Sequence, residues 1–485
     1  MNTYFSSKSN TVIRNSKKKI ARFNYIILVL YIFAIFYIRF FTENWIILPR
    51  IFQFIDLGMV LLTFILIVTW ILRGKRLKSN GINSNLLIGY IFILLISSTF
   101  NIMRLDPAVL GTYLLLQFGP LVFFVFFLTA NFNYIVIKKI LKIIFFTAII
   151  QIIFSIFQVP KALAQSPDWI NGTFGWNSTQ MLCFLSTFLF CVLSYFRVTR
   201  NKKYRKIIIF ILMFVVFIFY IASWRALWIS FPLTIIILFS LAKGGSHKIK
   251  QISLIVGIML IVFSFFYQFT SIYGETYSYE NKRIIKYLNF NYKITDIGKV
   301  RAFLSVFKMY GENPGTLFWG AGPGTYGSRA YKTFALSYGG KTDVTAGFVK
   351  TNYSTDVAEK YLYKYGGDDF RPITSSSTLH GWQSSYVSLL GETGILGFFF
   401  VIGIYISLFK YLYRLHQRSF DPLSYSLTLG LMGSLIFLAQ VSIFDDYLAT
   451  FRVTLPTWML IAVTIHYFKL NADKWMKKII AIKQN

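Results

Sequence analysis

The chain has 485 residues, of which 55% are hydrophobic and 14% are charged, and its formal net charge is +32. A soluble domain keeps about a quarter of its residues charged, so this composition excludes an ordinary soluble globular protein and indicates that lipid surrounds most of the chain. The basic residues stand in short blocks between apolar runs and not on one folded face, which argues against nucleic-acid binding and is typical of a positive-inside membrane protein.

Twelve apolar runs are each long enough to cross about 30 Å of hydrocarbon. They lie near residues 24–41, 50–72, 85–103, 113–130, 139–159, 178–196, 207–223, 226–242, 251–269, 387–409, 423–443 and 454–469. We therefore expect an all-α polytopic membrane protein with about twelve transmembrane helices. The first run is too long for the core of a cleavable signal peptide and is expected to be retained. The seventh and eighth runs are expected to form a helical hairpin.

The distribution of Lys and Arg predicts how the chain is oriented. With a cytoplasmic N-terminus, the inner segments carry 30 of the 50 Lys and Arg residues and the short outer segments carry 6. The other 14 lie in one long segment, and long loops translocate largely regardless of charge. Both termini are thus expected in the cytoplasm. The predicted division is transmembrane helices 1–9 within 1–269, a large extracytoplasmic loop domain with short helices at 270–386, helices 10–12 within 387–470, and a cytoplasmic tail at 471–485.

The large loop contains one stretch with helical periodicity. From Asp296 to Tyr310, apolar residues recur at helical spacing, which predicts an amphipathic helix that rests against the membrane surface. Its apolar face consists of Ile297, Val300, Phe303, Leu304 and Phe307. The stretch Gly320-Ala-Gly-Pro-Gly is expected to be a turn, because it lacks the spacing and the surrounding strands of a dinucleotide-binding fingerprint.

Three ionisable residues on the predicted outer side are candidates for chemistry. Arg225 stands at the tip of the hairpin, where its guanidinium could bind phosphate or simply reach lipid headgroups. Arg301 lies on the amphipathic helix, where a solvated surface role is the alternative. His380, just before the tenth span, could accept a proton at neutral pH. The other histidines, His247, His416 and His466, are expected at the surface.

Acidic residues offer a second set of candidates. The adjacent pairs Asp368–Asp369 and Asp445–Asp446 could ligate a divalent metal ion or could simply be solvated in loops. Asp56 lies within the second span, where a charge costs about 2.5–3.5 kcal/mol on insertion scales. We therefore expect Asp56 to have a polar partner or to face a cavity.

Four segments, in order over roughly residues 170–410, resemble the O-antigen ligase and O-antigen polymerase family of bacterial envelope polysaccharide enzymes. They are Asn171-Gly-Thr-Phe-Gly-Trp-Asn, then Ser223-Trp-Arg-Ala, then Arg301 with Asn313-Pro and Gly320-Ala-Gly-Pro-Gly, and finally His380-Gly-Trp-Gln with Leu389-Leu-Gly-Glu-Thr-Gly-Ile-Leu-Gly. Two positions depart from the family pattern: Trp224 stands before the arginine, and Gly381 stands where asparagine is common.

The resemblance implies a membrane glycosyltransferase that needs no metal or other cofactor. Its donor would be an oligosaccharide on a polyprenyl diphosphate at the outer leaflet of the bacterial cytoplasmic (inner) membrane, and its acceptor a glycan or a lipid. Arg225 and Arg301 would bind the diphosphate, and His380 would be the general base of an inverting displacement. We favour a polymerase over a ligase that transfers to a lipid core or protein. The alternatives are a transporter of lipid-linked oligosaccharides, a metal-dependent transferase that uses the outer aspartates, and a glycan-binding structural or sensor protein.

Overall fold

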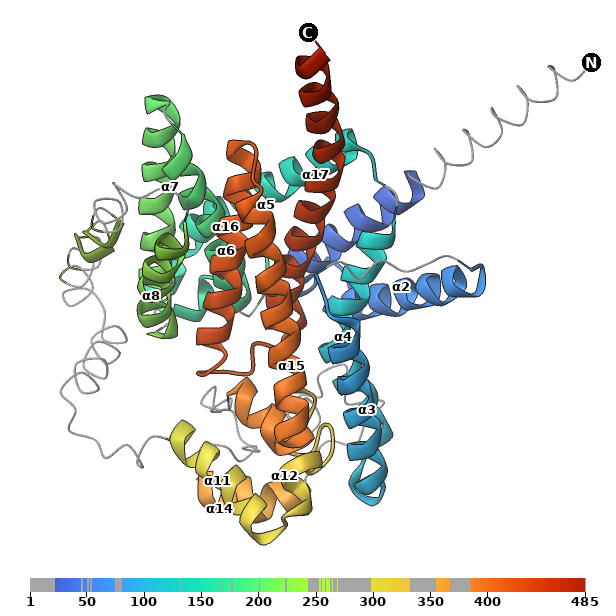
Figure 1. Cartoon of the computed structure of the whole chain (residues 1–485). Coiled ribbons are helices and arrows are strands. Elements are labelled where there is room, and N and C mark those ends of the chain that lie inside the picture. The colour runs from blue at the N-terminus through green and yellow to red at the C-terminus, as the bar shows by residue number, and fades with distance from the viewer. Residues whose placement is uncertain are drawn as a thin grey trace, which may run out of the picture.

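The computed structural model describes residues 22–44, 47–49, 52, 55–74, 81–130, 132–165, 167–175, 178–199, 201–222, 225–242, 298–331, 355–366 and 384–484, with part of 253–268. Every regular element among these residues is a helix (Figure 1). The all-α prediction is therefore confirmed for this part of the chain.

Eight helices in the described ranges are long and apolar enough to cross a membrane. They are α2 (Ile55–Leu72), α4 (Pro107–Thr129), α5 (Tyr134–Ala164), α6 (Ser178–Val198), α7 (Lys202–Ile221), α15 (Ser385–Gln417), α16 (Pro422–Val441) and α17 (Phe451–Gln484). Three further predicted spans correspond to the shorter apolar helices Arg22–Phe36, α3 (Ser84–Phe100) and α8 (Arg225–Leu241). The polytopic membrane architecture is thus supported. The number of twelve spans stays a prediction, because most of 251–269 lies outside the described residues.

Short polar motifs mark the points where two of these helices begin. The carboxylate of Asp106 accepts the Ala108 N–H at 2.8 Å, and Pro107 occupies the first position of α4. At the start of α16, Asp421 and Ser424 form a capping box, with Asp421 Oδ1 2.6 Å from the Ser424 nitrogen. Both motifs satisfy backbone N–H groups that have no partner within the helix.

The most enclosed part of the bundle is formed by α6, α16 and α17. In the most apolar 18-residue stretch of each of these helices, 78%, 78% and 89% of the residues are buried, against 28% in α2. Helix α2 points sideways from the other helices in Figure 1. Gly430 lets α16 approach α6 closely, because a Cβ there would lie 2.5 Å from the backbone nitrogen of Cys191. Ser426 also donates a hydrogen bond to the Cys191 carbonyl at 2.6 Å.

Ionisable residues inside the bundle have specific partners. Arg452 Nε donates to Asp56 Oδ2 at 2.6 Å, and both side chains are more than 90% buried. This pair confirms that Asp56 has a polar partner. The expectation that His416 and His466 lie at the surface is wrong, because both are buried. His416 Nδ1 lies 3.2 Å from Thr428 Oγ1, and His466 Nε2 lies 2.9 Å from the Phe127 carbonyl oxygen, so a neighbouring helix provides a partner for one nitrogen of each ring.

Short helices from the predicted large loop pack together at one end of the bundle (Figure 1). We call residues 298–331 and 355–366 the loop unit. It contains α11 (Gly298–Glu312), α12 (Gly315–Trp319), η7 (Ala358–Tyr363) and α14 (Lys364–Gly366). The unit has a small core of its own with buried tyrosines, in which Tyr363 donates a hydrogen bond to Tyr331 at 2.8 Å.

The predicted amphipathic helix is present as α11, but a different face of it is buried. Ala302, Val306 and Met309 are fully buried in the core of the loop unit. On the predicted apolar face, Leu304 is 49% exposed and Phe307 is 58% exposed. Phe303 of the predicted face does pack against this core, so the helix is apolar on two sides and its most buried side is the one that was not predicted. Contact of the exposed side with the membrane surface stays a prediction.

Contacts with α3 fix the loop unit to the bundle. Ser97, near the end of α3, donates a hydrogen bond to the Glu392 carbonyl at 3.1 Å, and Asn101 Nδ2 reaches the Gly320 carbonyl at 3.4 Å. Arg104 then pairs with Asp356 at 3.3 Å. The segment after α3, the loop unit and the start of α15 thus lie at the same end of the bundle, as the alternating topology requires. The side of the membrane that this end faces stays a prediction.

Candidate functional site

The structure describes the three predicted site residues to different extents. Arg301 lies in the first turn of α11 and is half-buried. Arg225 is the first residue of α8, and only its backbone is described. His380 lies outside the described residues, four positions before Ser384, and so do Asp368 and Asp369. Of the three, Arg301 is therefore the residue whose side chain the structure describes.

The first turn of α11 contacts the loop that joins α16 to α17. Lys299 Nζ donates a hydrogen bond to the carbonyl oxygen of Phe444. Burial lowers the pKa of Lys299, and the nearby Asp445 carboxylate opposes this effect. Arg301 follows two residues later, about 3 Å further along the helix axis, and its side chain leaves α11 on a different side from that of Lys299.

A second cation, Arg329, reaches the same loop from the end of the glycine-rich turn. Its backbone N–H donates to Asp446 Oδ2 at 2.8 Å. Burial raises the pKa of Asp446, while the Arg329 guanidinium and this N–H group act in the opposite direction. Asp445 Oδ1 accepts the Asp446 N–H at 2.7 Å. Both carboxylates therefore order the loop and balance part of the positive charge.

The start of α15 closes this arrangement. Ser384 Oγ donates to the Ser442 carbonyl at 2.9 Å, and Ser385 Oγ donates to the Asp445 carbonyl at 3.1 Å. The Leu448 N–H in turn donates to Ser385 Oγ at 3.0 Å. We call Lys299, Arg301 and Arg329, together with the 442–448 loop, the basic corner. It is assembled from α11, the glycine-rich turn, the start of α15 and the α16–α17 loop.

The glycine-rich turn is held by a buried carboxylate on α15. Glu392 is fully buried, and its Oε2 accepts the Gly324 N–H at 2.9 Å. Its Oε1 accepts the N–H groups of Tyr326 and Ser328, each at 3.0 Å. Two segments quoted for the family resemblance, Gly320-Ala-Gly-Pro-Gly and Gly391-Glu-Thr-Gly, are therefore in direct contact. The prediction of a turn at 320–324 is confirmed.

Glycine is required on both sides of this contact. Gly320 has a φ of 71°, and a Cβ there would overlap the backbone of Glu392. Gly394 has a φ of 67°, interrupts the helical geometry of α15, and would place a Cβ 2.5 Å from the Phe318 carbonyl carbon. Positive φ and backbone contact at this distance both exclude an ordinary side chain. The turn and the kink of α15 therefore fit together only as backbone against backbone.

The helix register places Arg225 at the same end of the bundle. Thr234 Oγ1 of α8 lies 3.2 Å from Gln440 Oε1 of α16, and Gly433 lies opposite Leu238. The two helices are therefore antiparallel, and α8 extends nine residues, or about 13 Å, from Thr234 back to its start. Because α16 ends at Val441, the start of α8 lies beyond it on the side of the 442–448 loop.

The other resembling segments have structural partners. The 171–173 backbone is bound by glutamines of α5: Gln158 Oε1 accepts the Gly172 N–H at 2.8 Å, and Gln151 Oε1 accepts the Thr173 N–H at 2.8 Å. Asn313 donates to the Tyr361 hydroxyl at 2.7 Å, at the opposite end of α11 from the basic corner. These contacts assign Asn313 and the 171–173 segment to the scaffold.

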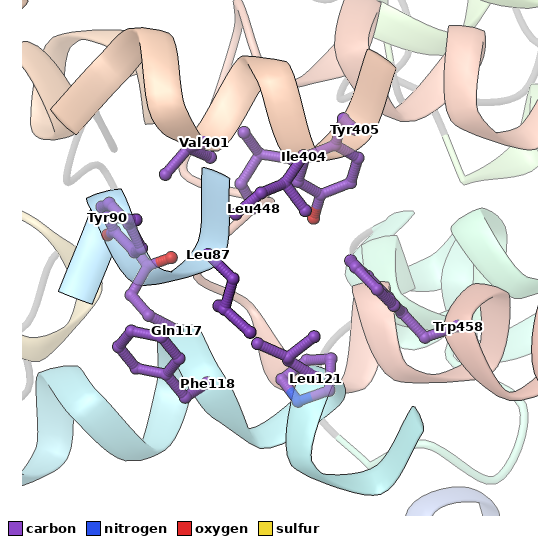
Figure 2. A pocket seen from close by; sticks show the side chains of 11 residues that line it. Leu87, Tyr90, Gln117, Phe118, Leu121, Val401, Ile404, Tyr405, Leu448 and Trp458 are labelled. Carbon is purple, nitrogen blue, oxygen red and sulfur yellow. The ribbon is translucent and has the colours of Figure 1, made fainter. Parts of the chain in front are cut away.

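A narrow apolar cleft lies between α3, α4, α15 and α17 (Figure 2). About 480 Å³ of space lies between its walls, and this figure includes open solvent at the mouth. Its walls are mostly apolar, with Gln117, Tyr90 and Tyr405 as the main polar side chains. Leu448 also lines it, so the α16–α17 loop contributes to both the cleft and the basic corner.

Within the described ranges, no three His, Cys, Asp or Glu side chains are grouped so as to hold a metal ion. Asp445 and Asp446 are adjacent, and the hydrogen bonds given above direct an oxygen of each toward a backbone N–H group. The predicted outer carboxylate pair is thus placed beside the basic corner.

Comparison with protein-family models and with curated proteins gives no match for this chain. The resemblance to O-antigen ligases and polymerases therefore rests on the four sequence segments alone. Lys299, Arg329 and Asp446 were not predicted as site residues, although Asp446 had been noted as half of an acidic pair. Their contacts join residues more than a hundred positions apart, and no local pattern encodes them.

Proposed function

We propose that this protein is a membrane glycosyltransferase that transfers or polymerises oligosaccharide from a polyprenyl-diphosphate carrier. The observation that carries the proposal is the basic corner, where Lys299 and Arg329 contact the 442–448 loop at one end of an apolar helical bundle and Arg301 lies in the same first turn of α11 as Lys299. A diphosphate leaving group develops negative charge, and fixed guanidinium and ammonium groups stabilise that charge best in a partly buried site. A site at the membrane boundary also suits a substrate with a lipid chain and a charged head.

The proposed reaction is a direct displacement at the sugar carbon that bears the diphosphate. The acceptor hydroxyl forms the new glycosidic bond, the bond to the diphosphate oxygen breaks, and the configuration inverts. His380 takes the hydroxyl proton, and Arg225 and Arg301 bind the diphosphate. Four residues of chain span at most about 14 Å, which limits the distance of His380 from Ser384 beside the basic corner.

The apolar cleft suits the lipid chain of the same donor. Leu448 belongs to both features, so a chain in the cleft and a diphosphate at the basic corner could be parts of one molecule. We favour a polymerase, whose acceptor is another lipid-linked glycan. A ligase that uses a lipid core or a protein is the alternative within this class. In either case we propose a multi-pass protein of the bacterial cytoplasmic membrane with its site facing outward.

The test is glycan transfer by the purified protein in lipid nanodiscs, with a polyprenyl-diphosphate oligosaccharide, in the presence and absence of a chelator. His380→Ala and Arg301→Ala are compared with Lys308→Ala, which removes an exposed cation from the same helix as Arg301. We expect chelator-resistant transfer that is lost in the first two variants and kept in the third. A ladder of lengthened products would indicate a polymerase.

The other outcomes separate the alternatives. Transfer that stops with chelator and returns with a divalent ion would favour the metal-dependent enzyme and its outer aspartates. Donor movement across the bilayer without transfer would favour a transporter. Glycan binding without turnover or transport would favour a structural or sensor protein. Unchanged turnover in His380→Ala and Arg301→Ala would refute the site assignment.

A further inference from the structure

Glu392 is the most completely enclosed carboxylate in the described part of the chain, and the proposed chemistry does not use it. It lies in α15, two residues before the kink at Gly394. Its carboxylate oxygens accept three backbone N–H groups, from Gly324, Tyr326 and Ser328. All three partners are donors, so the carboxylate oxygens act as acceptors in this arrangement.

The segment that Glu392 holds leads directly to the basic corner. Ser328 is the last residue of the segment bound by Glu392, and the next residue, Arg329, donates its N–H to Asp446. The opposite side of Glu392 is also fixed, because its carbonyl oxygen accepts hydrogen bonds from Ser97 of α3 and from the Gly322 N–H. One residue thus connects two membrane helices to the backbone that presents Arg329.

We propose that Glu392 is a positioning residue for the basic corner. Its carboxylate gathers alternate N–H groups of the 324–328 backbone and thereby sets the position of Arg329 against Asp446. The residue acts through the loop and does not itself contact the substrate. The expected effect of Glu392 on glycan transfer rests on the proposed function, whereas its effect on the order of the 324–329 loop does not.

Glu392→Gln tests the idea with almost no change in shape. The amide keeps one acceptor oxygen but turns an NH₂ group toward one of the backbone donors, so at least one N–H group loses its partner. The reporter is Ala330→Cys, next to Arg329 and only 1% exposed, in a background where Cys183 and Cys191 are replaced by alanine. Maleimide labelling of the cysteine then measures how often this segment opens.

We expect Glu392→Gln to raise the labelling rate at least tenfold and Glu392→Asp to give a smaller increase, because the carboxyl group with its two acceptor oxygens is kept and only its reach is shortened. Glu312→Gln is the matched control. It removes an exposed carboxylate of the loop unit, one that pairs with Lys360, and should leave the labelling rate unchanged. Equal labelling rates in Glu392→Gln and in the parent would overturn the proposal.

Two further measurements keep the result interpretable. Folding of Glu392→Gln is judged by size-exclusion chromatography. If this variant does not fold, Ser97→Ala takes its place, because it removes only one hydrogen bond to the Glu392 carbonyl. We then expect a two- to tenfold rise in the labelling rate, and no rise would overturn the proposal. In the transfer assay, Glu392→Gln should lower kcat by more than it raises KM. Faster labelling in a protein whose parent shows no transfer would refute the proposed function and leave the positioning role intact.

Discussion

Removal of the Arg452 side chain is expected to destabilise the helical bundle. Arg452 is the second residue of α17, and its Nε donates to Asp56 Oδ2 at 2.6 Å. The two side chains are 3% and 6% exposed, so Arg452→Leu would leave a carboxylate buried without its guanidinium. Loss of one partner from such a buried pair typically costs about 3–5 kcal/mol.

The size of the chain sets the expected change in melting temperature. Unfolding entropy is about 2.1 cal/mol/K per residue, which gives roughly 1 kcal/mol/K for 485 residues. A loss of about 4 kcal/mol would then lower Tm by roughly 4 °C if the chain unfolds in one transition. The measurement is thermal unfolding of the detergent-purified protein, followed by tryptophan fluorescence and by the fraction that remains monodisperse.

Two variants distinguish the ion pair from a general effect of losing an arginine. Arg414→Leu removes an exposed arginine of α15 and should change Tm by less than 1 °C, as surface substitutions usually do. The double variant Asp56→Leu with Arg452→Leu leaves no buried charge and should recover at least half of the loss. The reasoning is refuted if Arg452→Leu behaves like Arg414→Leu, or if the double variant is as unstable as the two single losses added together.

Three further predictions concern other parts of the molecule. Gly430→Val should prevent folded protein from accumulating, because its side chain would meet the backbone of Cys191; size-exclusion chromatography after expression measures this. Burial raises the pKa of Asp446 above its usual 3.8, so the folded state binds this proton more tightly and stability should fall as the pH rises from about 4 through the folded-state pKa. Asp446→Asn keeps an acceptor for the Arg329 N–H and should remove that slope from Tm measured against pH. Leu121→Trp places a larger side chain in the wall of the cleft. It should raise the KM for long-chain donors severalfold and leave the KM for short-chain donors unchanged.

Each of these predictions has a control and a contrary result. Gly311→Ala adds a Cβ in open space and should express normally; normal folding of Gly430→Val would contradict the close packing of α6 and α16. For Asp446→Asn, a pH slope identical to that of the parent would assign the titration to another group. For the cleft, Leu72→Trp is the exposed control, and an equal rise in KM for long and short donors would exclude a site for the lipid chain.

Local sequence patterns predicted most of the helices but few of the contacts between them. Apolar run length predicted α4–α7 and α15–α17, since a hydrocarbon environment leaves helices as the main solution for the backbone. The pattern failed for α11, where Leu304 and Phe307 are exposed and Ala302 and Val306 are buried. An alanine contributes little to a hydrophobic pattern, yet it permits the closest packing. Buried His416 and His466 were missed because their partners, Thr428 and the Phe127 carbonyl, are supplied by other helices.

The candidate site was predictable only in part, for a related reason. Arg301 could be singled out because it is a cation on an apolar-patterned helix. Lys299 and Arg329 become part of the site through Phe444 and Asp446, which lie 145 and 117 positions away. Such pairings depend on which loops meet at one end of the bundle, and no periodicity encodes them. The acidic pair at 445–446 was a usable signal, because two adjacent carboxylates at the end of a span need donors or cations nearby.

The course of α15 explains how one helix could serve both parts of a lipid-linked substrate. Its start binds the α16–α17 loop through Ser385, its Glu392 side chain holds the glycine-rich turn, and the kink at Gly394 follows. Val401 lies seven residues beyond the kink, about 10 Å along the helix, in the wall of the apolar cleft. A lipid chain that contacts Val401 would therefore contact the same helix that, on the other side of its kink, holds the glycine-rich turn. Under the proposed function, binding of the lipid chain and positioning of the cations would be coupled through this helix. A free sugar nucleotide has no lipid chain and would not engage this coupling.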